Sequence, residues 1–127
     1  MEMTKNAISW FEIPVTDFER AKAFYSQIFD YEMTEMEMGP YKMGFLPADQ
    51  ENGGVGGAIL KGEGYEPSLQ GARIYLNGGS DLTVVLNRVE SAGGKIILSK
   101  TEITPEFGYY ATFEDTEGNR VHLHSTS

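Results

Sequence analysis

The fold can be read outward from one stretch, Trp10-Phe11-Glu12-Ile13-Pro14-Val15-Thr16-Asp17-Phe18-Glu19. Its first part is rich in β-branched and aromatic residues, and Pro14 is typical of a strand end or an edge strand, which predicts a strand over residues 7–15. Thr16 and Glu19 have the spacing of a capping box, in which Thr16 accepts from a first-turn amide and Glu19 reaches back to the Thr16 amide. A helix is therefore expected directly after the strand.

Helical periodicity continues beyond this stretch. An apolar face that is expected to pack on a sheet is formed by Phe18, Ala21, Phe24, Tyr25, Ile28 and Phe29. Shorter strand candidates follow at residues 31–38, 41–46 and 55–61, and turns rich in glycine and polar residues separate them. The first half thus has the order βαβββ.

The second half repeats this order. A strand is predicted at residues 72–76, followed by a helix whose cap is Ser80 or Asp81. This helix is expected to end at Gly93 and Gly94. Its buried apolar stripe is formed by Leu82, Val85, Leu86, Val89 and Ala92. Strands are predicted at 95–99, 108–114 and 120–125. We therefore predict an α+β chain of one domain, residues 1–127, in which a linker at about 62–70 joins module one (about 7–61) to module two (about 71–126).

Composition narrows the classes of partner. The formal charge of -9 repels phosphate backbones and anionic lipid, which argues against nucleic-acid and membrane-surface roles. No cysteine is present, so disulfides, thiolate metal sites and a cysteine nucleophile are excluded. The first residues are polar and no apolar span is long enough to cross a bilayer. We expect a cytoplasmic protein whose partner is a small molecule or another protein chain.

Two segments resemble the opening and the closing of one known superfamily. The first runs from Trp10 to Asp17 and continues through Ala21 to Phe24-Tyr25. The second comprises Ala92-Gly93-Gly94-Lys95 and Phe113-Glu114-Asp115-Thr116-Glu117-Gly118-Asn119-Arg120-Val121. In order and separation they resemble the vicinal-oxygen-chelate superfamily of glyoxalases, bleomycin resistance proteins and dioxygenases. The resemblance implies that the two modules form a curved mixed sheet around a small-molecule cavity, and that two chains pair as a homodimer.

The resemblance also implies where a metal would bind. Enzymes of this superfamily hold a divalent metal with one His, Gln or Glu side chain from each of four strands. These positions fall on Trp10, on Arg73 or Tyr75, on Gly57, Ile59 or Lys61, and on His122. Only His122 is a usual ligand, so the set is incomplete and lactoylglutathione lyase activity itself is not expected. Glu12 and His122 remain candidates for a displaced metal site, and the cofactor stays open.

The period of two in a strand indicates which side chains share a face. It groups Trp10 with Glu12, Arg73 with Tyr75, and Arg120 and His122 with His124. The opposite faces are apolar, as suits strands that pack against helices: Phe11, Ile13, Val15, Ile74, Leu76, Val121 and Leu123. With the register that the resemblance implies, the polar sets line one cavity. There Trp10, Tyr75 and His124 would contact substrate and Arg73 would hold an anionic group.

Two functional classes follow. The first is a glyoxalase-like enzyme, related to lyases, isomerases or dioxygenases, that acts on a small oxygenated or aromatic metabolite with Glu12 as base and His122 as base or metal ligand. In a purely structural alternative, Glu12 pairs with Arg73 or a histidine only to balance charge. The second class is a non-catalytic binder, similar to the antibiotic-sequestering members, whose aromatic and acidic cavity captures a cationic or aromatic compound. We favour the first class.

Overall fold

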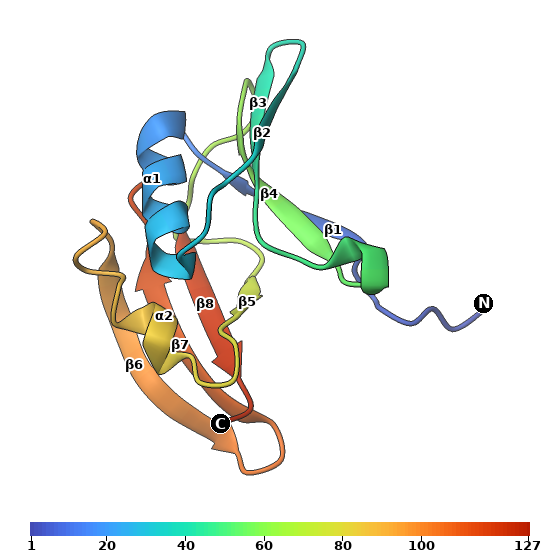
Figure 1. Ribbon diagram of the computed structural model, residues 1–127, viewed down its shortest axis with the longest axis vertical. Helices are drawn as coiled ribbons and strands as arrows, with labels where there is room; N and C mark the ends of the chain where they lie inside the picture. The colour runs from blue at the N-terminus through green and yellow to red at the C-terminus, as the bar shows by residue number, and fades with distance from the viewer.

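The computed structural model describes residues 1–127 and contains two halves with the same order of elements (Figure 1). The first half runs through β1 (Trp10–Pro14), α1 (Phe18–Phe29), β2 (Glu35–Met38), β3 (Tyr41–Phe45), the 3-10 turn η1 (Gln50–Asn52) and β4 (Gly56–Lys61). The second half runs through β5 (Tyr75–Asn77), α2 (Thr83–Leu86), β6 (Lys95–Thr104), β7 (Gly108–Glu114) and β8 (Arg120–Ser125). The predicted α+β class with two βαβββ modules is confirmed.

Each module builds its own mixed four-stranded sheet. The strand orders are β1-β4-β3-β2 and β5-β8-β7-β6. Strand β1 pairs with β4 and β5 with β8 in parallel, and the other neighbours are antiparallel. The two edge strands β1 and β5 form no ladder with each other, so the single curved sheet that was expected is divided in two. Figure 1 shows β1 to β4 at the upper right and β5 to β8 below them.

The start of α1 differs from the capping box that the sequence predicted. The N-cap residue is Asp17, whose side chain accepts a hydrogen bond from the Arg20 amide at 3.1 Å. The Thr16 amide donates to Glu117 Oε1 at 3.0 Å, so the predicted pairing of Thr16 with Glu19 is wrong. The reason is tertiary: the β7–β8 turn lies against the start of the helix and supplies the acceptor in place of Glu19.

Helix α2 is shorter than the apolar stripe that contains it. Its regular part spans only Thr83–Leu86, and the chain then continues with bonds of 3-10 type, as from the Val89 amide to the Leu86 carbonyl at 3.1 Å. Several β-branched residues lower the helix propensity of this segment. The N-cap residue is Leu82, which has no side-chain cap, so the predicted cap at Ser80 or Asp81 is wrong. Asp81 lies one residue earlier, and its Oδ1 accepts from the Thr83 amide at 3.0 Å. Neither α-helix has the length and hydropathy of a membrane-spanning segment.

The two modules share one hydrophobic core on the helix side of both sheets. A cluster of 19 buried residues draws on both halves and includes the predicted apolar strand residues Ile13, Val15, Leu76, Val121 and Leu123. The Phe24 ring of α1 lies 5.8 Å from the Phe113 ring of β7, so the helix of module one packs against the sheet of module two. A Cβ at Gly94 would lie 2.7 Å from the Phe24 ring, so this close approach requires glycine.

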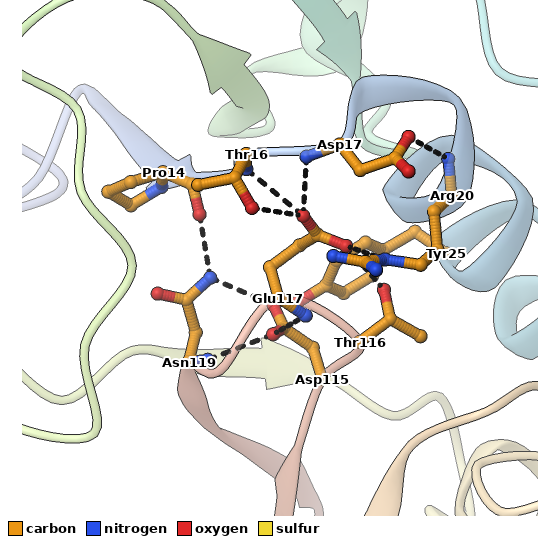
Figure 2. A network of polar contacts seen from close by, with 9 residues as sticks. All are labelled: Pro14, Thr16, Asp17, Arg20, Tyr25, Asp115, Thr116, Glu117 and Asn119. Carbon is orange, nitrogen blue, oxygen red and sulfur yellow. Dashed lines mark hydrogen bonds and ion pairs between the residues drawn. The ribbon is translucent and has the colours of Figure 1, made fainter.

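A buried carboxylate strengthens the contact between the modules (Figure 2). Glu117 Oε1 accepts hydrogen bonds from the amides of Thr16 and Asp17 and from the Thr16 hydroxyl, at 2.7 to 3.0 Å. Glu117 Oε2 accepts from Arg20 Nε at 2.7 Å. Burial alone raises the pKa of the Glu117 carboxyl, but these hydrogen bonds, that from Arg20 first, outweigh it and lower the pKa to about 2. The carboxylate is therefore charged in the folded protein at every ordinary pH.

Two further side chains of the same turn contact module one (Figure 2). Tyr25 of α1 donates its hydroxyl hydrogen to Asp115 Oδ2 at 2.7 Å, and both side chains are buried. Asn119 Nδ2 donates to the carbonyl of Pro14 at 2.7 Å. The β7–β8 turn therefore fixes the end of β1 and the first turns of α1 at once, which sets the position of one sheet relative to the other.

Candidate functional site

The first sheet presents Trp10 and Glu12 on the face that is turned away from α1. The register pairs Trp10 with Gly56 and Glu12 with Ala58, so these residues share that face, as the alternation predicted. A small apolar cluster lies on it, made of Met43, Ala58 and Leu60 with Trp10, Tyr41, Phe45 and Tyr65 packed against them. The face is therefore largely aromatic and apolar around one carboxylate.

The metal-ligand positions that the resemblance implied on β4, namely Gly57, Ile59 or Lys61, lie one residue out of register. Gly57 pairs with Phe11, and Ile59 is buried in the core that contains α1. Together with Lys61 they lie on the helix side of the strand, and the residues that face away are Gly56, Ala58 and Leu60. None of those three carries a metal-binding side chain.

Glu12 is held by hydrogen bonds from two aromatic side chains. Trp10 Nε1 donates to Oε2 at 3.3 Å, and the Tyr65 hydroxyl donates to Oε1 at 3.0 Å. This hydrogen bond to Glu12 raises the pKa of the Tyr65 hydroxyl. Glu12 forms no ion pair with Arg73 or with a histidine, so the charge-balancing pair considered from the sequence is not formed. Tyr65 was not identified from the sequence, because it lies in the linker, where no periodicity indicates its direction.

The second sheet presents a layered group of rings around His122. Tyr75 of β5 pairs in register with His122 of β8 and stacks on its imidazole, with 4.5 Å between ring centroids and 19° between ring planes. The Tyr110 ring lies 6.5 Å from the same imidazole. The Thr112 hydroxyl hydrogen-bonds to His122 Nδ1 at 2.8 Å. His122 is only 1% exposed, and its ring orientation is fixed by these neighbours.

The free nitrogen of His122 lies in a cationic environment. Burial lowers the pKa of His122, and the charges of Arg73 and then Arg120 lower it further, so the imidazole is neutral at neutral pH. Its Nε2 is buried without a hydrogen-bond partner, and the one other such side-chain atom in the chain is Arg120 Nε. Buried polar atoms in proteins almost always have partners. This face of β8 therefore carries two buried nitrogens whose hydrogen-bonding capacity is unfilled.

The other predicted residues of this face are placed differently. Arg73 lies exposed in the segment before β5, close enough to His122 to affect its pKa. His124 lies on the same side of β8 as His122, opposite Tyr110 in the register. Its Nε2 hydrogen-bonds to the carbonyl of Phe107 at 2.6 Å, which attaches it to the β6–β7 turn.

One chain does not bring all the predicted site residues into one cavity. Trp10 lines a hollow of about 420 Å³ on the first sheet, and Glu12 lines another of about 220 Å³. Arg73 and Tyr75 line a third, of about 380 Å³, between the two modules. Within one chain these residues and His122 therefore line no common cavity, because β1 and β5 form no ladder and each sheet presents its own set.

The hollow between the modules includes residues that the sequence assigned only to the core. Its walls are largely apolar, with Arg73 as the one charged residue among Ile8, Phe11, Phe29, Leu46, Pro47, Val55, Gly56, Gly57, Arg73, Ile74, Tyr75, Leu76 and Asn77. A Cβ at Gly57 would collide with the Phe11 ring, so glycine lets this wall form. No sequence signal separates Phe11 from its core neighbour Ile13, since both follow the same alternation.

The donor set of the chain does not fit a divalent metal. No three His, Asp or Glu side chains lie together where they could hold one ion. Glu12 and His122, the two candidates, belong to different sheets. The guanidinium groups of Arg73 and Arg120, whose charges already disfavour the protonated form of His122, would also repel a dication. The displaced metal site considered from the sequence therefore has no support within one chain.

Comparison with known proteins identifies the family of this fold. The family model of the Glyoxalase/Bleomycin resistance protein/Dioxygenase superfamily matches residues 7–123. A relative described as a glyoxylase-like domain-containing protein from Didymella fabae is 32% identical over 118 residues, which are 88% of each chain. The match spans both modules and their linker.

Solved structures of known proteins share the fold at lower identity. TnmS3, an antibiotic binding protein from Streptomyces sp. CB03234, superposes with a TM-score of 0.69 at 20% identity, over 99% of this chain and all of that one (100%). A glyoxalase I mutant from Zea mays superposes with a TM-score of 0.68 at 15% identity, over 91% of this chain and 44% of that one. At such identity these likenesses establish the arrangement of the modules and not a reaction.

Proposed function

Because the chain belongs to the Glyoxalase/Bleomycin resistance protein/Dioxygenase superfamily, we propose that it acts on a small oxygenated or aromatic metabolite bound against His122. The observation that carries this proposal is the buried Nε2 of His122, which has no partner in the chain although Thr112 already occupies Nδ1. A neutral imidazole held in this way accepts or returns a proton near neutral pH. Tyr75 supplies a flat apolar surface beside it for an aromatic or planar ligand.

We further propose that the complete site is shared by two chains of a homodimer. One sheet carries the carboxylate of Glu12 and an aromatic, apolar face, while the other carries His122 and the cationic face. Antiparallel pairing of two copies would set module one of each chain opposite module two of the other. The Glu12 face of one chain would then cover the His122 face of its partner, and the dimer would contain two equal cavities. Sedimentation at micromolar concentration is expected to give a dimer, and a monomer throughout would contradict this arrangement.

In such a cavity Glu12 and His122 have complementary roles. Glu12 is a base candidate whose direction is set by Trp10 and Tyr65, and His122 exchanges a proton through Nε2. Arg73 holds an anionic group of the substrate. These groups suit proton transfer next to a carbonyl, as in a lyase or isomerase. Lactoylglutathione lyase activity itself is not proposed, because its ligand positions hold Trp10 and Arg73 or Tyr75, and dioxygenase chemistry has no residue here that favours it.

A non-catalytic binder is the second candidate. The apolar face of the first sheet, with Trp10, Phe45 and Tyr65 around a buried methionine, favours it because aromatic walls and flexible thioethers accept varied flat ligands. One protein of similar fold is described as antibiotic binding. In this case Glu12 attracts a cationic compound and His122 transfers no proton. Cytoplasmic location stays a prediction from the sequence under either function.

A thermal-shift screen separates the two candidates. The compounds are an α-ketoaldehyde adduct, an aromatic diol, an aromatic α-hydroxy acid and a cationic antibiotic, and a ligand of the folded state raises the melting temperature by mass action. We expect an oxygenated compound to raise the melting temperature of the parent chain. This increase should be lost in His122→Gln and retained in His124→Gln. A shift only with the antibiotic, lost in Glu12→Gln, would favour the binder, and no shift with any class would contradict both.

A further inference from the structure

Two arginines of the second module lack a carboxylate partner in a strongly acidic chain. The sequence carries 19 Asp and Glu against 10 Lys and Arg. Neither Arg73 nor Arg120 forms an ion pair, although five such contacts occur elsewhere in the chain. Glu12 and Glu66 line the same hollow as Arg120 without pairing with it. With so many carboxylates available, two unpaired arginines on the walls of one hollow are unexpected on electrostatic grounds.

These arginines lie on the walls of one small hollow. Arg73 and Arg120 enclose a space of about 40 Å³ together with the loop from Leu69 to Ala72. That volume suits a group the size of a carboxylate and is too small for a large ligand. Arg120 Nε is buried without a hydrogen-bond partner, and it lies on the same strand as the equally unpartnered Nε2 of His122. A planar anion would satisfy the guanidinium in the fork geometry that arginine prefers.

We propose that Arg73 and Arg120 together bind a carboxylate group of the substrate, so that the metabolite is a small oxyacid and not a neutral carbonyl compound. The inference rests on the proposed function, since it names the substrate class of the same face. The carboxylate is held between the two guanidinium groups, and the reacting part of the molecule then extends along β8 toward His122 and Tyr75. Charge neutralisation by the ligand removes the repulsion between the two arginines, which adds to its affinity.

The test compares mandelate, an aromatic α-hydroxy acid, with mandelamide, its uncharged counterpart, by calorimetry on the full chain. We expect mandelate to bind at least about tenfold more tightly than mandelamide, because only the acid carries the anion that the guanidinium groups recognise. Equal affinity for both would overturn the carboxylate site and leave the proposed function intact. Binding of neither compound would overturn the carboxylate site together with the proposed function for this class of metabolite.

Arginine variants assign the effect to these two residues. Arg73→Gln and Arg120→Gln are each expected to reduce mandelate affinity about tenfold or more and to leave mandelamide unchanged. Lys95→Gln, which removes an exposed positive charge that forms no ion pair, is the matched control and should bind as the parent does. If Arg120→Gln fails to fold, Arg120→Lys takes its place, because lysine retains the charge without the forked guanidinium. Its mandelate affinity should lie between that of the parent chain and that of Arg73→Gln. Unchanged mandelate affinity in both folded variants would overturn the proposal.

Discussion

The Tyr75 ring lies flat on the imidazole of His122, with 4.5 Å between the ring centroids. Tyr75 itself is 49% exposed while His122 is buried, so the tyrosine is the cover that separates this histidine from solvent. Because burial is the main cause that lowers the pKa of His122, Tyr75→Ala is expected to raise that pKa toward its ordinary value of 6.5. NMR titration of the two histidines measures it. Tyr75→Phe should leave the pKa low, and an unchanged value in Tyr75→Ala would contradict the covering role.

The lowered pKa of His122 predicts a loss of stability in mild acid. Below pH 6.5 the unfolded chain binds a proton on this histidine more readily than the folded chain, so the free energy of unfolding decreases as the pH falls. Denaturant unfolding between pH 8 and pH 5 should show this slope, and His122→Gln should flatten it. His124→Gln is the control. A slope that persists unchanged in His122→Gln would assign the effect to other groups.

The buried carboxylate of Glu117 predicts a large stability effect far from the site. Glu117→Gln leaves the amides of Thr16 and Asp17 with a weaker acceptor and Arg20 without its counter-charge, so a loss of about 2–4 kcal/mol in the free energy of unfolding is expected. Glu90→Gln, on an exposed position, should change it by less than about 0.5 kcal/mol. Equal effects of the two substitutions would show that the network does not join the modules.

The hydrogen bonds of Glu117 also predict a loss of folding stability in stronger acid, below the range in which His122 acts. The pKa of Glu117 is about 2 in the folded chain against an ordinary value of 4.5, so its stabilisation is complete above pH 4.5 and is lost as the pH falls toward 2. Arg20→Ala removes the hydrogen bond that lowers this pKa most. Acid titration followed by circular dichroism should therefore show that Arg20→Ala unfolds at a higher pH than the parent chain. An identical acid midpoint in Arg20→Ala and the parent chain would count against this assignment.

Purified protein is expected to hold no stoichiometric divalent metal. The donor set is incomplete and two guanidinium groups lie beside His122, so binding of a dication is disfavoured. Metal analysis of protein prepared without chelators measures this, with His122→Gln and Glu12→Gln as matched samples. About one metal per chain that disappears in both variants would restore the metal site that the sequence left open.

The features that could be predicted from the sequence are those fixed by local periodicity. The apolar faces of β1 and β8 follow from a period of two, and the buried face of α1 follows from helical spacing. The repeated element order followed from the same periodicity, and the resemblance of the two end segments added the family.

The features that could not be predicted depend on contacts between distant residues. Glu117 caps the start of α1 from 101 residues away, so a local capping rule selected Glu19 instead. Tyr65 reaches Glu12 from a linker without periodicity, over 53 residues. The division into two sheets was also missed, since alternation gives the face of each strand but not which edges join. The predicted site residues therefore had the right faces and were assigned to one cavity that a single chain does not form.

The most direct test of the shared site is a mixed dimer of two variants. Glu12→Gln and His122→Gln chains carrying different tags are coexpressed, and the dimer bearing both tags is purified. If the cavity joins Glu12 of one chain to His122 of the other, each single-variant dimer loses the exchange of the mandelate α-hydrogen with solvent deuterium, whereas the mixed dimer retains one intact site. Exchange by the mixed dimer at about half the rate of the parent dimer is the predicted result. No exchange by the mixed dimer, or undiminished exchange by either single-variant dimer, would contradict it.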